Sequence, residues 1–467
     1  MLDVEQGRQA AAEVFHAQGE MVGEVTATNA LLQSRLTAST GLVEGDVPGA
    51  PGVARFEFST DADFASARTT PWLRAGAERD FIVRTPIGEL APATRYFYRL
   101  RFGVDESALK IGPTRSFITL PGPGHEGTVR FVVANCMNYS FFHRGANNDG
   151  EGGYDGPDRH LGYPAAEVIE RLGPDFFIGA GDNVYYDHPA KGRAETRIEL
   201  RRKWHEQFVQ PRLVSLFAEV PTYWLKDDHD YRINDSDPTG DYAPSHELGI
   251  ATFREQLPVV DPSDSGATTY RTIRAGRHLQ LWFVEGRDHR SPNKSPDGPG
   301  KTIWGGEQKA WLQRTLLASD ATFKILVSPT PMVGPDDASK NDNHTNPGGF
   351  RHEGDAFFAW LRANRVPTNR FFILCGDRHW KYHSVHPAGY AEFSCGALNR
   401  ENSRRGRSPG DPKSTDPKAT VVQPYTDPDP LGGFLEVELA AGEGESPALT
   451  FRLRDDAGRQ LYQSVVP

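Results

Sequence analysis

Four short segments of the sequence end in side chains that can bind metal ions. In each one an apolar, strand-like run leads into a polar loop: VVANC at 132–136, GDNVYYD at 181–187, KDDHD at 226–230 and CGDRH at 375–379. Two neighbouring cations need a bridging carboxylate, further oxygen, sulfur or imidazole donors on each side, and an open edge for substrate. The pattern therefore predicts a two-metal phosphoesterase. The candidate ligands are Cys136, Asp182, Tyr185, Asp228, Asp377 and His379.

Taken singly, each of these residues also has a structural interpretation. Cys136 at a strand end could be a small buried hydrophobic residue, and Tyr185 could be a core aromatic. The acidic pair at 227–228 could form a solvated loop, and His379 could be a hydrogen-bonded interior histidine. Their combination in one order along the chain favours the metal-binding interpretation.

The elements that must position these side chains show the sequence pattern of an α/β domain. From residue 128 onward strand-like runs alternate with helical patterns, as in VRFVVAN at 129–135, AAEVIERL at 165–172 and DFFIGAGD at 175–182. Sites on an open α/β sheet are expected at the carboxyl ends of its strands. We therefore expect the polar loops to meet along one edge of a sheet.

The N-terminal part of the chain has a different pattern. Residues 1–19 are predicted to be a leader or short helix. Between 20 and 120, short β-type runs are separated by turns, which is typical of a small β-sandwich. The turn-rich stretch at 121–127 is a plausible linker. We therefore predict a β-sandwich domain at 20–120 and a catalytic domain at 128–467.

Composition limits the partners of the protein. Lys and Arg total 52 against 62 Asp and Glu, a net charge of −10 over 467 residues, so no electrostatic affinity for nucleic acid or an anionic membrane is evident. A small-molecule phosphate ester would have to be attracted locally. No apolar run approaches the roughly 18 residues of a membrane-spanning helix. With only three cysteines, a disulfide framework is not expected, and the oligomeric state stays open.

Six motifs in order carry a family resemblance. They are Cys136, GDNVYYD, DDHDYRIND at 227–235, RDHRSP at 287–292, GGEQKAWL at 305–312 and GDRH at 376–379. With them the chain resembles the PhoD-like alkaline phosphatase and phosphodiesterase family, within the calcineurin-like metallophosphoesterase superfamily, over nearly everything after residue 20. The resemblance implies an α/β (α+β) fold, a four-layer αββα metallophosphoesterase sandwich preceded by a small fibronectin-like β-sandwich domain.

The resemblance also implies a division of the ligands between two metal sites. Asp182 would bridge, and Cys136, Tyr185 and His379 would complete a first site, which holds iron(III) in some family members. A thiolate and a phenolate suit a strongly acidic cation that keeps them ionised. The second site would take Asp228, Asp377 and Asn234. Such an oxygen-rich set suits calcium, manganese or magnesium.

The expected mechanism follows from the positive charge of the two metal ions. A hydroxide bridging the two metals would attack phosphorus, and His229 would stabilise or protonate the leaving alkoxide, with Asp230 orienting its imidazole. Arg287 and Arg290 are the candidates for binding nonbridging phosphoryl oxygens, because a planar guanidinium matches their geometry. Asn138 could add a neutral donor.

Three functions from different classes stay open. The first is hydrolysis of phosphate monoesters, diesters or both. The second is a phosphodiesterase of phospholipase D type, which an apolar mouth lined by Trp or Phe would favour over a small arginine-lined pocket. The third is a noncatalytic binding protein with a vestigial metal domain. Family resemblance implies a secreted or periplasmic location; the chain as given shows no signal peptide, and a cytoplasmic location also stays open.

Overall fold

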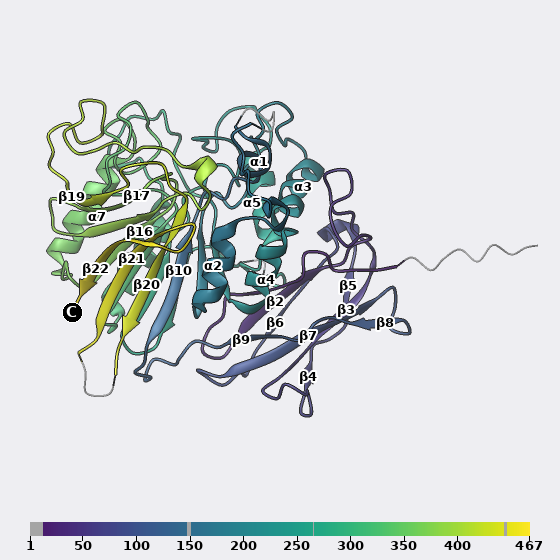
Figure 1. Ribbon diagram of the computed structural model, residues 1–467. Coiled ribbons are helices and arrows are strands. Elements are labelled where there is room, and N and C mark those ends of the chain that lie inside the picture. The colour runs from purple at the N-terminus through teal and green to yellow at the C-terminus, as the bar shows by residue number, and fades with distance from the viewer. Residues whose placement is uncertain (1–12, 147–150, 265, 443–445) are drawn as a thin grey trace, which may run out of the picture.

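Two stacked β-sheets form the centre of the protein. The computed structural model describes residues 13–146, 151–264, 266–442 and 446–467 (Figure 1). One sheet has nine strands in the order β22-β21-β20-β10-β11-β12-β1-β2-β6, and the other has seven in the order β13-β14-β15-β16-β18-β17-β19.

The strands of the nine-stranded sheet are β1 (Glu20–Gly23), β2 (Ala30–Arg35), β6 (Ile82–Ile87), β10 (Val129–Ala134), β11 (Phe176–Ala180), β12 (Thr222–Leu225), β20 (Gly433–Ala440), β21 (Ala448–Asp455) and β22 (Gln460–Val466). Those of the seven-stranded sheet are β13 (Arg271–Ala275), β14 (Leu279–Phe283), β15 (Phe323–Ser328), β16 (Phe371–Cys375), β17 (Lys381–Val385), β18 (Ala391–Cys395) and β19 (Val422–Thr426).

Alternating side chains along the strands build three apolar layers. In β10, Phe131 and Val133 pack between the sheets, while Val132 and Ala134 pack against helices, because successive residues of a strand point to opposite faces. The helices on that outer face are α2 (Pro164–Leu172), α3 (Arg197–Phe208), α4 (Pro211–Glu219) and α5 (His246–Gln256).

The seven-stranded sheet repeats this arrangement. Ile325 of β15 faces the other sheet, and its neighbour Leu326 faces outward. The outer face is covered by α6 (Gly305–Ala318) and α7 (Arg351–Ala363). Figure 1 shows α2 and α4 on one side of β10, β20 and β21, with α7 on the other side. The expected αββα layering is confirmed.

The strands that carry the candidate ligands end at one edge. Strands β10, β11 and β12 are parallel in one sheet, and β14, β15 and β16 are parallel in the other. The sheets approach each other closely at Gly376, where an added Cβ would lie 2.1 Å from the carbonyl oxygen of Ala180. The absence of a side chain at Gly376 therefore lets the loop after β16 reach the loop after β11.

The N-terminal strands form a β-sandwich that is joined to the central sheet. One of its layers is a six-stranded sheet: β3 (Gly52–Ser59), β4 (Arg68–Thr69), β5 (Leu73–Ala75), β7 (Arg95–Gly103), β8 (Leu109–Ile111) and β9 (Arg115–Ile118). The other layer, β1, β2 and β6, continues the nine-stranded sheet, because Gly23 of β1 pairs in parallel with Thr222 of β12. The division at 20–120 and 128–467 stays a prediction, and the two parts share this sheet.

The leader is described only from residue 13. Within 13–19, Phe15 pairs with Thr37 as an isolated β-bridge, where the sequence suggested a leader or short helix. The rest of the predicted 1–19 segment lies outside the described residues. Over the described part of the chain, none of the helices combines the length and the apolar character needed to cross a bilayer.

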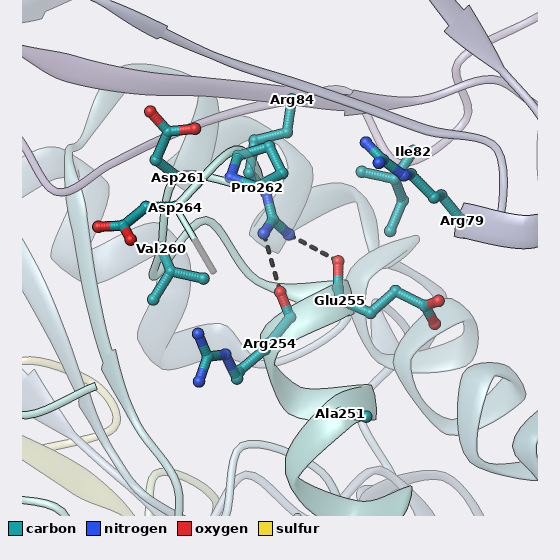
Figure 2. Close-up of a pocket in the computed structure, with 10 residues that line it drawn as sticks. All are labelled: Arg79, Ile82, Arg84, Ala251, Arg254, Glu255, Val260, Asp261, Pro262 and Asp264. Carbon is teal, nitrogen blue, oxygen red and sulfur yellow. Dashed lines mark hydrogen bonds between the residues drawn. The ribbon is translucent and has the colours of Figure 1, made fainter. Parts of the chain in front are cut away.

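Polar contacts join the N-terminal part of the chain to helices α3 and α5. Arg84 of β6 donates to the carbonyl oxygens of Arg254 and Glu255 at the end of α5, at 2.8 and 2.6 Å (Figure 2). Those carbonyls have no partner within their own helix, so the guanidinium caps it.

A second contact is a buried ion network. The ring nitrogens of His205, on α3, lie 2.6 Å from Asp46 and 2.7 Å from Asp80. Arg35 of β2 also binds Asp80, at 3.0 Å. Burial acts to raise the pKa of Asp80, but His205 and Arg35 together lower it well below its ordinary value. The Asp80 carboxylate is therefore stabilised in the folded protein.

We expect Asp80→Asn to lower the free energy of unfolding at pH 7 by about 3–5 kcal/mol, because it leaves the buried guanidinium of Arg35 without its carboxylate. Because the folded pKa of Asp80 lies below the unfolded value of about 3.9, its contribution is present above that pH and is lost as the pH falls further. Urea unfolding of both proteins between pH 7 and pH 3 tests this.

The matched control is Asp320→Asn, which removes an exposed carboxylate paired with Arg274 at 2.7 Å. It should leave the urea midpoint nearly unchanged. Equal midpoints for wild type and Asp80→Asn at neutral pH would contradict the assignment.

Candidate metal centre

Three groups of potential ligand atoms share the carboxylate of Asp182, and two of them combine residues from both sheets. In the first, atoms of Cys136, Asp182 and His379 all lie within 4.8 Å of one another. In the second, the same holds for Asp182, Asp227 and Asp377. A carboxylate common to two groups is the arrangement that a pair of bridged cations requires.

Three of these residues have a backbone conformation that non-glycine residues rarely adopt. Cys136, Asp182 and Asp377 have φ values of 51°, 52° and 61°, in the left-handed region. Each lies within two residues of the end of its strand, on β10, β11 and β16 respectively. Such conformations cost about 1–3 kcal/mol each and are found mainly at functional sites, where the surrounding structure maintains them. The backbone is thus arranged to direct these side chains toward one place.

Cys136 and Asp182 of the first group, with the adjacent Tyr185, are buried and difficult to ionise. The Cys136 Sγ and the Tyr185 hydroxyl both lie 3.3 Å from Oδ2 of Asp182. Burial, together with neighbouring acidic groups, raises the pKa of the Cys136 thiol, the Tyr185 phenol and the Asp182 carboxyl well above their ordinary values. Ionising all three requires a strong positive charge beside them, which a highly charged metal ion supplies. The donor set therefore fits a metal.

Asn402 supports this group from a distant part of the sequence. It lies at the end of the 3₁₀ helix Arg400–Asn402. Its Nδ2 donates to the Tyr185 hydroxyl at 2.9 Å and to the Cys136 carbonyl at 3.0 Å, and its own carbonyl accepts from Nδ1 of His379 at 2.5 Å.

The tautomer of His379 suits a ligand. Because its Nδ1 donates to Asn402, Nε2 of the neutral ring keeps its lone pair. Burial, with the nearby Arg404, lowers the pKa of His379 to about 3, so the ring is neutral at ordinary pH. A neutral imidazole with one nitrogen anchored is the usual form of a metal-binding histidine.

The second group is surrounded by cations. Nε of Arg287 donates to Oδ1 of Asp227 at 2.8 Å, while Oδ2 of Asp227 is buried without a hydrogen-bond partner in the described structure. Arg378 pairs with Asp377. An unpaired buried carboxylate oxygen is costly, and a bound cation would satisfy it.

Asp228, the neighbour of Asp227 in the sequence, is a second carboxylate that lies close to Asp182. Its ligand atoms group with those of Asp182 and His229, and separately with those of Asp235 and Asp342. The sequence pattern predicted Asp228 as the ligand. The structure places an oxygen of Asp227 as well as one of Asp228 close to Asp182.

Sequence comparison assigns the chain to a family. The model of the PhoD-like phosphatase matches residues 131–429, and that of the PhoD-like phosphatase N-terminal domain matches residues 4–118. The chain belongs to the PhoD-like phosphatase family. The resemblance found in the six motifs is confirmed.

Individual relatives agree with this assignment. Alkaline phosphatase D of Bacillus subtilis (strain 168) is 23% identical over 335 residues, 66% of this chain, and the match spans only 54% of that protein. A solved structure of PhoD superposes with a TM-score of 0.70 at 17% identity, covering 97% of this chain and 93% of that one. A purple acid phosphatase from yellow lupin (Lupinus luteus) seeds superposes with a TM-score of 0.60 at 14% identity, covering 96% and 73%. The predicted fold class is thereby confirmed.

The imidazole of His229 has a different partner from the one expected. Its Nδ1 lies 2.7 Å from Oδ1 of Asp187. Asp230, which was expected to orient it, instead accepts hydrogen bonds from the backbone and side chain of Asn183 and from the backbone of Asp227. Asp230 therefore fixes the two ligand loops to each other, and Asp187 holds His229.

The predicted phosphate-binding arginines differ in their surroundings. Arg287 was predicted to bind nonbridging phosphoryl oxygens. It is fully buried and bonds to Asp227 and to the carbonyl oxygen of Ser236. Arg290 is also buried and donates to the Asp342 carbonyl, but its Nε and Nη1 have no partner in the described structure. Of the two, Arg290 retains free N–H groups.

Two other predicted residues lie beside the centre with different roles. Asn138 is buried; its side chain caps α1 (Tyr139–Arg144) by accepting from the backbone N–H of Phe141 at 3.0 Å. Asn234 is exposed, and its backbone N–H donates to Asp187 at 2.9 Å. The described structure shows no contact that brings the Asn234 side chain to the ligand groups.

Three residues of the centre were missed by sequence reasoning: Asp187, Asp227 and Asn402. Asp187 ends the GDNVYYD motif, and Asp227 begins DDHDYRIND, so their motifs could have indicated them. Asn402 lies in a polar, proline-rich stretch, and no local pattern marks it.

We expect Asn402→Ala to weaken metal binding at the Cys136 and Tyr185 group by about 10- to 100-fold, because it removes the donors that position the phenol and the strand end. Metal content after dialysis against graded chelator, measured by elemental analysis, tests this.

The matched control is Asn364→Ala at an exposed helix end, where the amide donates only to the Trp360 carbonyl. It should retain wild-type metal content. If Asn402→Ala also retains its metal at every chelator concentration, the supporting role of Asn402 is wrong.

Proposed function

We propose that this protein is a metal-dependent phosphoesterase that hydrolyses phosphate monoesters, diesters or both. The observation that carries the proposal is the pair of ligand groups sharing Asp182 at the carboxyl ends of parallel strands. Membership of the PhoD-like phosphatase family and the name of the Bacillus subtilis relative, alkaline phosphatase D, support it.

Two metal ions are proposed, one on each side of Asp182. Cys136, Tyr185 and His379 would hold the first, for which the thiol and phenol favour iron(III). Asp377, with Asp227 or Asp228, would hold the second, and its oxygen ligands suit calcium, manganese or magnesium. When bound, the ions would supply Lewis acidity that activates water and offsets the charge of the phosphoryl group.

The side chains around the centre can perform the remaining steps. His229 is held through Nδ1 by Asp187, which leaves Nε2 available to protonate the departing oxygen. Arg290 offers Nε and Nη1 to nonbridging phosphoryl oxygens. Burial and neighbouring Arg287 lower the pKa of Arg290 to about 10, so it remains a cation at neutral pH.

The surroundings of the centre favour a water-soluble ester over a phospholipid. The cavity beside His379 is walled mainly by charged side chains, and its one tryptophan, Trp380, is only 3% exposed. A phospholipase D type of site would need an apolar mouth for the acyl chains. The noncatalytic alternative is disfavoured because a full set of potential ligands is present.

The proposed partner is therefore a small-molecule phosphate ester. The secreted or periplasmic location stays a proposal based on family resemblance.

We expect Asp182→Asn to lower hydrolysis of p-nitrophenyl phosphate and bis-p-nitrophenyl phosphate at least a thousandfold, about 4 kcal/mol of transition-state stabilisation, because the carboxylate proposed to be shared by the two metal ions is lost. Steady-state assays from neutral to alkaline pH, with elemental analysis of each protein, test this. Asp320→Asn serves as the control and should keep the wild-type rate. A near-normal rate for Asp182→Asn would disprove the shared site.

We expect His229→Ala to slow the reaction by about 10²–10⁴-fold for phenyl phosphate and less for p-nitrophenyl phosphate, whose better leaving group needs less protonation. Asp187→Asn should show the same leaving-group dependence with a smaller effect. Metal content should survive in both variants. Equal losses for the two esters would contradict proton donation by His229.

A further inference from the structure

A polar cavity of about 620 Å³ adjoins the metal centre. Its wall includes Trp380, which follows His379 in the sequence, and Arg404, whose backbone N–H donates to the His379 carbonyl at 3.1 Å. Asp235, on another part of the wall, donates its backbone N–H to Asp228 at 2.5 Å. The cavity therefore begins beside the candidate ligands and is large enough for a small organic molecule.

Most charges in this wall are already paired. Lys340 binds Asp235 at 2.7 Å, and Arg407 binds Asp337 at 2.7 Å. The remaining wall carboxylate, Asp336, pairs with the buried Arg378. Arg405 forms an ion pair with Asp429 at 2.8 Å.

Arg404 is the exception among the charged residues of the wall. Its side chain is exposed and makes neither an ion pair nor a hydrogen bond within the described part of the chain. Its backbone is tied to the candidate ligand His379 by the hydrogen bond described above. An unpaired guanidinium therefore belongs to the wall of the cavity beside the candidate centre.

The Arg404 guanidinium rests on a rigid support. Its central carbon lies 5.6 Å from the centre of the Trp380 ring, within the range of a cation–π contact. The ring itself is packed against Gly406, where an added Cβ would lie 2.1 Å from it, and against Arg378. Trp380 is therefore a fixed platform for Arg404 and exposes almost no surface of its own to a ligand.

We propose that this cavity receives the leaving group of the ester, and that Arg404 selects phosphate esters whose leaving group carries a second anionic group, a carboxylate or a phosphate. A guanidinium forms paired hydrogen bonds with either anion, and it is the one wall cation without a carboxylate partner. The inference rests on the proposed phosphoesterase function and assigns the substrate class of the same site.

The test compares two esters that differ only in the second anion, phenyl phosphate and 4-carboxyphenyl phosphate, with the full-length, metal-loaded protein and phosphate release as the readout. The wild type should show the higher kcat/KM for the carboxylated ester. Arg404→Gln should lower the ratio of the two kcat/KM values by about tenfold, because one close charge pair is lost. Arg404→Lys should recover part of the ratio. With 1,4-phenylene bisphosphate, a similar preference would show that phosphate is accepted as well.

Arg405→Gln is the matched control, because Arg405 belongs to the same wall but is paired with Asp429. It should leave the ratio within about twofold of the wild type, since an exposed pair contributes little. An equal fall in the ratio for Arg405→Gln and Arg404→Gln would overturn the assignment to Arg404.

Binding without turnover gives a second readout. The nonhydrolysable 4-phosphonobenzoate should inhibit the wild type more strongly than phenylphosphonate, and Arg404→Gln should remove this difference. If the wild type hydrolyses both esters with a ratio that Arg404→Gln does not change, the inference is wrong and the phosphoesterase proposal stands. If the metal-loaded wild type hydrolyses neither ester, the proposed function itself is wrong.

Discussion

The mutual repulsion of buried carboxylates around Asp182 is the constraint on which the rest of the structure depends. Burial and the charge of Asp228 raise the pKa of Asp182, and Asp227 and Asp377 lie within 4.8 Å of it. Such a cluster is unfavourable unless cations compensate it. The protein supplies Arg287 beside Asp227 and Arg378 beside Asp377. The proposed metal ions would supply the remaining positive charge.

Holding this cluster together requires both sheets at once. Asp182 and the acidic pair 227–228 follow strands of the nine-stranded sheet, whereas Asp377 and His379 follow β16 of the other sheet. The close approach at Gly376 brings the two sets of loops together, and left-handed backbone at three ligand positions turns the side chains inward. The candidate centre is therefore built from loops of both sheets, and it forms only where the two sheets meet.

If the proposed function is correct, the candidate centre and the adjoining cavity would divide the recognition of an ester between them. The candidate ligands, with His229 and Arg290, would bind the phosphoryl group, whose chemistry is the same in every phosphate ester. The cavity next to His379 has an almost balanced wall in which Arg404 alone lacks a carboxylate partner. The proposal would place substrate choice in a part of the wall formed by loops, which vary more readily than the strand ends.

The sequence by itself determined the candidate ligands at the strand ends, the order of the motifs and the layered fold class, because these depend on local patterns: an apolar run, a tight turn and a polar side chain within a few residues. Only the tertiary structure decided contacts between distant segments. It showed that Asp187 rather than Asp230 holds His229, that Arg287 is engaged by Asp227, and that Asn402 supports the first ligand group. It also placed β1 beside β12, which joins the N-terminal sandwich to the central sheet. Spacing along the chain carries no information about which of several neighbouring polar groups will meet, because that depends on packing across the two sheets.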